Sequence, residues 1–269
     1  MIEIGGIYSS SGCKTEINKN IIEVSAPTSI VGDNEHYVAS AVSVGYNVSI
    51  KDSELKLNTT EPERSHLLHL GGTNTKLDVI NCYLESSTGI ISCGEGTTFT
   101  TGITNSTMKA YSNGLCYFPG KAGFGEGSFL KDCTIITGDA SELTSSITPL
   151  YCGVIAGPLL LDSCDIKVGN NVPTIFNISS TGKLSMSNCT IDKAGSQKIA
   201  MVAGSELNVG VNCNVHADIV SGGEAIATSE LYRFIKDTDN CSSKDLKVCF
   251  EYITKSISDR LSSIVEGGI

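Results

Sequence analysis

The residues best suited to chemistry in this sequence are few and scattered. His66 and His69 share one expected strand, but their spacing places them on opposite faces, so we expect no shared metal ion. Asp237 and Asp239 stand close together, but they belong to the C-terminal tail rather than to the repeats described below. Arg64 is the single arginine among those repeats. The sequence therefore predicts no catalytic residue, no metal centre and no bound cofactor.

The cysteines allow two interpretations. The chain has 11 of them, an odd number, and no Cys-x-x-Cys pair, which argues against a zinc ribbon and against a dithiol redox site. They form either a disulfide framework or a set of buried free thiols that pack as small apolar side chains. The sequence starts without a basic segment and apolar stretch of the secretory kind. We therefore favour free thiols and synthesis in the cytoplasm.

Aromatic residues gather around an insertion near residues 119–127, and they are the candidate binding residues: Tyr111, Tyr117, Phe118 and Phe124. Aromatic rings exposed on a rigid scaffold can stack on sugar rings, so a surface polysaccharide is the partner that they would fit. The alternative is that Phe118 and Phe124 pack locally and hold the loop.

A short repeat must position all these residues. Its pattern is apolar-x-apolar-x-(Asn/Asp)-(Cys/Ser)-x-apolar, as in Leu77-Asp-Val-Ile-Asn-Cys-Tyr-Leu84. The fifth position, here named the corner column, holds mostly Asn and Asp: Asp52, Asn81, Asn105, Asp132, Ser163, Asn188 and Asn212. The copies follow each other every 24 to 31 residues and are rich in Thr, Ile, Val and Gly, which excludes helical repeats.

One repeat fits one coil of three short strands. Leu77 and Val79 would point inward, Asn81 would turn the chain in the left-handed conformation, and Cys82 would point inward again. A single coil cannot bury its apolar face, so coils must stack. We therefore predict an all-β fold, a parallel β-helix of about seven coils with a C-terminal α-helical tail. We also expect the cysteines that follow the corner to be buried and reduced.

The Asn-rich corner followed by a small inward residue resembles the right-handed parallel β-helix proteins of the pectate-lyase-like superfamily over about residues 48–228. That resemblance implies that an active site would lie on the outward positions of the strand before each glycine, where we place His69, Ser92, Tyr117, Asn177 and Met201. None of these is a carboxylate, and the galacturonase-like signatures are absent from the repeats. Within this fold the chain is most similar to bacteriophage spikes and fibres.

The composition divides the chain into three parts. Residues 1–47 are expected to be irregular strands that either add coils or cap the end, residues 48–228 to be the β-helix, and residues 229–269 to be a helical tail. The tail has an apolar face of assembly residues: Leu246, Phe250, Ile253, Ile257, Leu261 and Ile264. Such a helix either joins copies of the chain or folds back as a cap.

The net charge of −10 makes nucleic acid and anionic lipid poor partners, and no apolar run reaches the roughly 20 residues of a membrane span. By fold-level analogy, we expect a structural or adhesive virion component, a spike, fibre or decoration, that forms a homotrimer, contacts other virion proteins and attaches to host-surface glycan. Two alternatives stay open. One is a polysaccharide lyase or glycoside hydrolase on this fold, and the other is a cell-surface or cytoskeletal β-solenoid.

Overall fold

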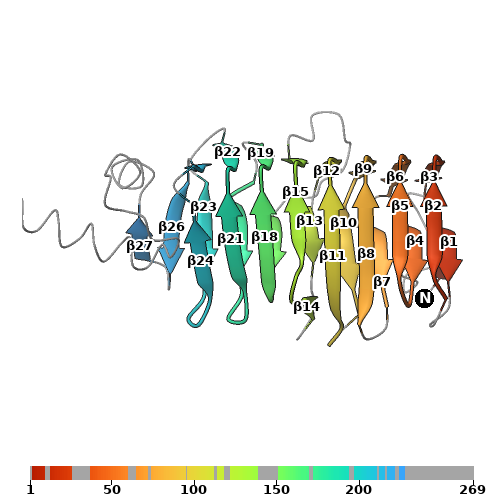
Figure 1. Ribbon diagram of the computed structural model, residues 1–269, viewed down its shortest axis with the longest axis horizontal. Helices are drawn as coiled ribbons and strands as arrows, with labels where there is room; N and C mark the ends of the chain where they lie inside the picture. Colours follow the sequence, from red (N-terminus) through yellow and green to blue (C-terminus); the bar gives the residue numbers. More distant parts are fainter. Residues whose placement is uncertain are drawn as a thin grey trace, which may run out of the picture.

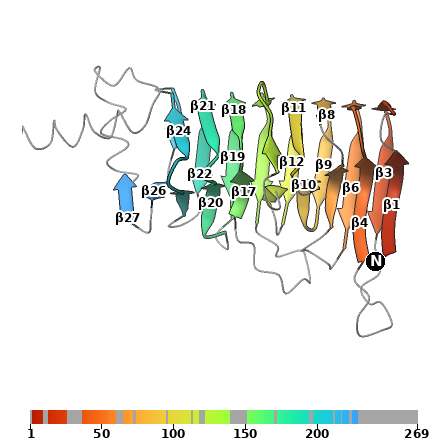
Figure 2. The same ribbon diagram turned by 90° about the horizontal axis from the view of Figure 1, so that it is seen from below.

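The computed structural model of the protein describes residues 2–9, 13–25, 37–59, 65–71, 74–94, 96–111, 114–117, 122–138, 151–169, 172–193, 197–210, 212–215, 217–221 and 224–227. Within these ranges the chain consists of short strands joined by turns, and the strands form four sheets, here named A to D. Figure 1 shows the coils stacked along the long axis, from β1 and β2 at one end to β24 and β26 at the other. The view at right angles shows the same stacking (Figure 2).

Each sheet takes one strand from each successive coil. Sheet A contains β1 (Ile2–Ser9), β4 (Tyr37–Val44), β7 (His66–Leu70), β10 (Gly89–Cys93) and β13 (Gly114–Tyr117). Sheet B contains β2 (Thr15–Asn18), β5 (Val48–Lys51), β8 (Thr75–Ile80), β11 (Thr98–Thr104), β15 (Phe129–Lys131), β18 (Pro158–Asp162), β21 (Lys183–Ser187) and β24 (Glu206–Val209), with β14 (Gly123–Phe124) beside β11. Sheet C contains β3 (Ile21–Ser25), β6 (Glu54–Asn58), β9 (Tyr83–Ser86), β12 (Thr107–Ala110), β16 (Thr134–Thr137), β19 (Asp165–Val168), β22 (Thr190–Lys193) and β25 (Asn214–Val215). Sheet D contains β17 (Tyr151–Ile155), β20 (Thr174–Ile178), β23 (Lys198–Met201), β26 (Asp218–Ser221) and β27 (Glu224–Ala227).

In the first five coils the chain passes from sheet A to B to C, and in the later coils it passes from sheet D to B to C; each coil repeats the path one strand further on. Strands β7, β8 and β9 thus pair in parallel with β10, β11 and β12. Sheet D continues the side formed by sheet A, since β17 lies beside β13 and the Cys116 thiol donates a hydrogen bond to the Val154 carbonyl at 3.0 Å. The prediction of an all-β parallel β-helix is confirmed.

The corner between sheets B and C has one conformation through most coils. Asp52, Asn81, Asn105, Asp132, Ser163 and Asn188 have φ between 48° and 55°, which is the left-handed region. The N–H of Asn81 donates to the Thr104 carbonyl of the next coil at 3.2 Å, and its side-chain amide donates to Asp52 Oδ1 at 3.1 Å. Asn212 belongs to a repeat with one extra residue, and its amide likewise donates to Asn188 Oδ1, at 3.1 Å.

The residue after each corner points into the core, where the side chains are small: Ser53, Cys82, Ser106, Cys133, Cys164, Cys189 and Cys213. Ser53, Ser106 and Cys213 also accept a hydrogen bond from a backbone N–H of the preceding coil. The Cys82 N–H donates to Ser106 Oγ at 3.1 Å, and the Cys189 N–H donates to Cys213 Sγ at 3.5 Å. The five cysteines are buried free thiols, as predicted. Hydrogen bonding to neighbouring thiols, together with burial, raises the pKa of Cys164, so this position stays uncharged.

The described residues before position 48 add coils rather than cover the end. Strands β1 to β4 pair in parallel with β4 to β7, in the same pattern as the later coils, so the boundary expected at residue 48 falls inside a coil. Sheets B and C therefore stack eight strands along their main path, against the seven coils expected. The sequence pattern does not identify the first corner, because Lys19, with φ of 54°, stands where later coils mostly have Asn or Asp.

The end of the β-helix nearer the C-terminus has a different arrangement of strands. Strand β27 pairs antiparallel with β26, so it ends the parallel stacking of sheet D. The predicted helical tail and its assembly residues lie outside the described residues: Leu246, Phe250, Ile253, Ile257, Leu261 and Ile264.

We predict that Asn188→Leu destabilises the protein more than Asn208→Leu. Asn188 has a left-handed backbone, and its amide donates to Asp162 Oδ1, while Asn208 is a half-buried outward residue of β24 with one long hydrogen bond to Ser185. Strain and lost hydrogen bonds at the corner should cost about 1–3 kcal/mol of unfolding free energy. Urea denaturation of both variants measures this, and equal losses would contradict the role given to the corner.

Candidate functional site

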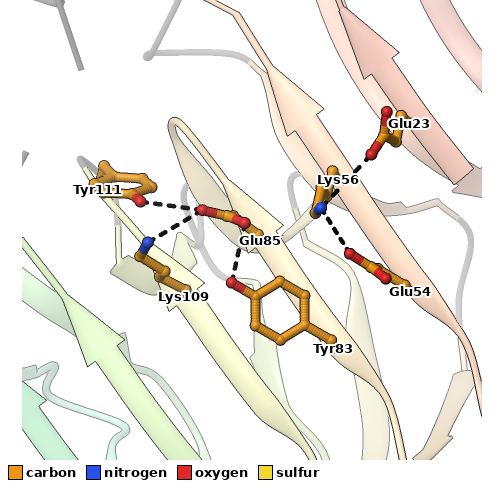
Figure 3. A network of polar contacts seen from close by, with 7 residues as sticks. All are labelled: Glu23, Glu54, Lys56, Tyr83, Glu85, Lys109 and Tyr111. Atoms are coloured by element: carbon orange, nitrogen blue, oxygen red, sulfur yellow. Dashed lines mark hydrogen bonds and ion pairs between the residues drawn. The ribbon is translucent and has the colours of Figure 1, made fainter. Parts of the chain in front are cut away.

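A network of charged and phenolic side chains covers the outward face of sheet C across four coils (Figure 3). Its charged residues form one column, at the position four residues after each corner. Glu23, Lys56, Glu85 and Lys109 occupy this column on β3, β6, β9 and β12, in parallel register. Their charges alternate from coil to coil, so each side chain has neighbours of opposite sign.

Glu85 is the centre of the network. Its Oε1 accepts a hydrogen bond from the Tyr111 hydroxyl at 3.0 Å and lies 3.3 Å from Lys109 Nζ. Its Oε2 accepts a hydrogen bond from the Tyr83 hydroxyl at 3.0 Å. The Glu85 side chain is 24% exposed, so these contacts are partly shielded from water. Both oxygens of this carboxylate therefore have partners within the protein.

These contacts fix the protonation states. Burial alone would raise the pKa of Glu85, but hydrogen bonds from Tyr83, Tyr111 and Lys109 together hold that pKa below its usual value. Hydrogen bonding to Tyr111, and then to Glu85, raises the pKa of Lys109. Burial raises the pKa of both tyrosines. Near neutral pH the network thus holds a carboxylate, an ammonium group and two neutral phenols, none with the pKa near 7 that suits a general acid or base.

Lys56 extends the network toward the first coil. Its Nζ lies 2.6 Å from Glu54 Oε1 and 3.6 Å from Glu23 Oε1, and it stands 6.0 Å from the centre of the Tyr83 ring. These groups are more exposed than Glu85, so screening by water weakens their ion pairs. The network joins neighbouring coils through their side chains.

Two of the four candidate binding residues from the sequence, Tyr111 and Phe124, offer no exposed ring. Tyr111 is buried and belongs to the Glu85 network. Phe124 is buried against Phe99, with ring centres 5.3 Å apart, so the alternative of local packing holds for this ring. Tyr117 ends β13 in register with Ser92, and Phe118 lies outside the described residues. Sugar stacking needs an exposed ring, and neither Tyr111 nor Phe124 offers one.

The outward face of β7 and β10, where the resemblance to β-helix enzymes would place an active site, is not an open groove. His69 and Ser92 stand in register as expected, with His69 Nδ1 and Ser92 Oγ 2.9 Å apart. However, Leu67 and Leu68, which are neighbours on β7, are both fully buried, so both faces of this strand are covered. At Leu67 and Ile90 the outward side of sheet A is therefore buried.

In sheet D the expected outward column shifts by one residue. A bulge on β20 pairs Asn177 with Ala200, and Met201 instead packs against the core. In the described part of the chain no group of three His, Cys, Asp or Glu side chains could hold a metal ion. No helix in the same ranges is long and apolar enough to cross a membrane.

Comparison with known proteins gives no relative. No family model, no curated protein and no solved structure matches this chain. The likeness to the pectate-lyase-like superfamily and to phage spikes therefore depends on the repeat alone.

The sequence analysis missed the Glu85 network, although a signal was present. Counting four residues on from Asp52, Asn81 and Asn105 gives Lys56, Glu85 and Lys109, an alternation of charge that the aligned repeats contain. The hydrophobic pattern that revealed the coils says nothing about outward positions, which is why this alternation was overlooked.

We predict that Glu85→Gln lowers the unfolding free energy by about 1 kcal/mol at pH 7. Because the folded pKa of Glu85 is lowered, its contribution is present above the usual glutamate pKa of about 4.3 and disappears as the pH falls through the folded value. The difference between wild type and Glu85→Gln should therefore shrink between pH 7 and pH 3, as measured by urea denaturation. Glu206→Gln is the control, since its ion pair with Lys183 is half exposed and should matter less. A difference that persists at pH 3 would contradict this account.

Proposed function

We propose that this protein is a non-catalytic structural and adhesive β-helix, a bacteriophage virion component such as a spike, fibre or decoration. The observation that carries the proposal is the unbroken stacking of sheets B and C, with eight strands along each main path. Backbone hydrogen bonds, corner amides and the Glu85 network all connect one coil to the next. A rod connected in this way resists bending, which is what a fibre requires.

The chemistry of the outward face supports a role without catalysis. Glu85 and Lys109, the most enclosed ion pair on sheet C, are held in their charged forms by each other and by two tyrosines. Proton transfer at neutral pH would require one of these groups to change its charge, and the network opposes that. The arrangement therefore stabilises the rod.

The buried free thiols fit assembly in a reducing compartment. Cys133, Cys164, Cys189 and Cys213 stack in consecutive coils without disulfides. Virions are assembled in the cytoplasm of the host cell, where thiols stay reduced. The resemblance to phage spikes implies a homotrimer, with the copies joined through the tail and with other virion proteins as further partners.

Imaging tests the proposed role. Gold-labelled antibodies raised against the purified chain would be applied to phage particles from the host of this gene and viewed by electron microscopy. Label at symmetric positions on the particle is expected. Label on the host cell surface or cytoskeleton instead, or release of sugar fragments from polysaccharide by the purified chain, would overturn the proposal in favour of a cellular solenoid or an enzyme.

We predict that the tail joins copies of the chain. Light scattering should give the mass of a trimer for the full chain and of a monomer for a chain without residues 229–269, with the β-sheet circular dichroism unchanged. In the full chain, Phe250→Ser with Ile257→Ser should also weaken the trimer, since both residues belong to the expected apolar face. A monomeric full chain, or a truncated chain that unfolds, would identify the tail as a cap.

A further inference from the structure

The outward face of sheet B carries two exposed apolar side chains next to each other. Phe129 on β15 is 37% exposed and Leu160 on β18 is 42% exposed, and the two residues are paired in register. The column continues with Gly102 on one side and Ser185 on the other. Gly102, Phe129 and Leu160 are named here the Phe129 platform.

The platform depends on a glycine, because Gly102 leaves space where a side chain would stand. A Cβ atom added at Gly102 would lie only 3.0 Å from Cζ of Phe129, so the ring of Phe129 occupies the space above Gly102. The ring is thereby supported by the backbone of β11, and the rest of it faces water. The β-helix thus holds an aromatic surface in a fixed position, at little cost in side-chain freedom.

Polar groups surround the platform on the same face of sheet B. Asp78 precedes Gly102 in the column, and its Oδ1 would lie 3.3 Å from the added Cβ, so this carboxylate stands beside the ring. Lys131 and Asp162 form the neighbouring outward pair, two residues beyond Phe129 and Leu160 on their strands. An apolar surface with hydrogen-bonding groups at its rim matches a ligand with one apolar face and hydroxyl groups around its edge.

The size of the platform argues against a protein partner. An aromatic side chain has a surface of about 150–250 Å². The exposed fractions of Phe129 and Leu160 thus leave less than about 200 Å² of apolar surface between them, whereas a stable protein interface buries about 800 Å² on each partner. A single sugar ring is small enough to be matched by such a surface.

We propose that the Phe129 platform binds a sugar ring of a surface polysaccharide by stacking, with Asp78, Lys131 and Asp162 as hydrogen-bonding partners for its hydroxyl groups. This proposal rests on the adhesive part of the proposed function and gives it a place on the molecule. It replaces the cluster around residues 111–124, of which Tyr111 and Phe124 are buried.

The test measures whether the protein binds short oligosaccharides from bacterial surface polysaccharides. Binding is detected by NMR, both as saturation transfer to the sugar and as shifts of the phenylalanine ring signals. The full-length wild type should bind at least one of them and shift the Phe129 ring signals. Phe129→Ala should weaken that binding at least about fivefold. Phe129→Tyr should retain it, and Leu160→Ser should weaken it to a lesser extent. Tyr46→Ala is the matched control, because Tyr46 is 40% exposed outside the platform and its loss should change nothing.

Each contrary result has a distinct meaning. If no oligosaccharide binds, or if Phe129→Ala binds as well as wild type, the platform is not a sugar site, while antibody labelling of the particle can still support the virion role. If the platform binds sugar but the particle carries no label, the virion role fails and the binding site stands. If Phe129→Ala or Leu160→Ser dissociates an oligomer without affecting sugar binding, the platform is an interface between copies and the proposal is overturned. Circular dichroism identifies any variant that fails to fold, and Leu160→Ser then decides the result in place of Phe129→Ala.

Discussion

The turn from sheet B to sheet C is the constraint on which the rest of the structure depends. Each coil must change direction within one residue, and a residue other than glycine in the left-handed conformation costs about 1–2 kcal/mol. Asn81 offsets this cost by bonding to both neighbours, since its N–H donates to Thr104 and its amide donates to Asp52. Those partners belong to the coils on either side, so the corner is stable only when the coils are stacked. Each coil therefore gains part of its stability from the coils stacked on it.

Stacking in register turns each position of the repeat into a straight column with its own chemistry. The position after the corner must be small, and its side chain accepts the N–H that the turn leaves without a strand partner, as Ser106 does for Cys82. Serine and cysteine meet both requirements, which accounts for the cysteine content without any disulfide. The position four residues after the corner faces outward, where alternating charge connects the coils through Glu85 and Lys109.

The sequence predicts the features whose causes are local. Asn81 and Cys82 could be placed because a left-handed turn and a small inward residue each restrict the residue type. The first coil was missed because Lys19 carries no such signal, although it has the same φ. The burial of Tyr111 and Phe124 depends on contacts with Glu85 and Phe99 in other strands, which no single repeat encodes. The outward column of sheet D was misplaced at Met201 because a bulge on β20 changes the register, and a bulge leaves no mark in the hydrophobic pattern.

The described faces of the β-helix differ in which side chains they leave available to a ligand, and this difference is the basis of the proposed binding site. Sheet C directs its charges toward each other, so the Glu85 network has little left to offer a ligand. Sheet A is covered on both sides at β7 and β10, where Leu67 and Ile90 are as buried as the core residues beside them. Sheet B instead keeps the ring of Phe129 partly exposed above Gly102. An exposed ring on a rigid parallel sheet is a fixed surface at which a ligand can replace water.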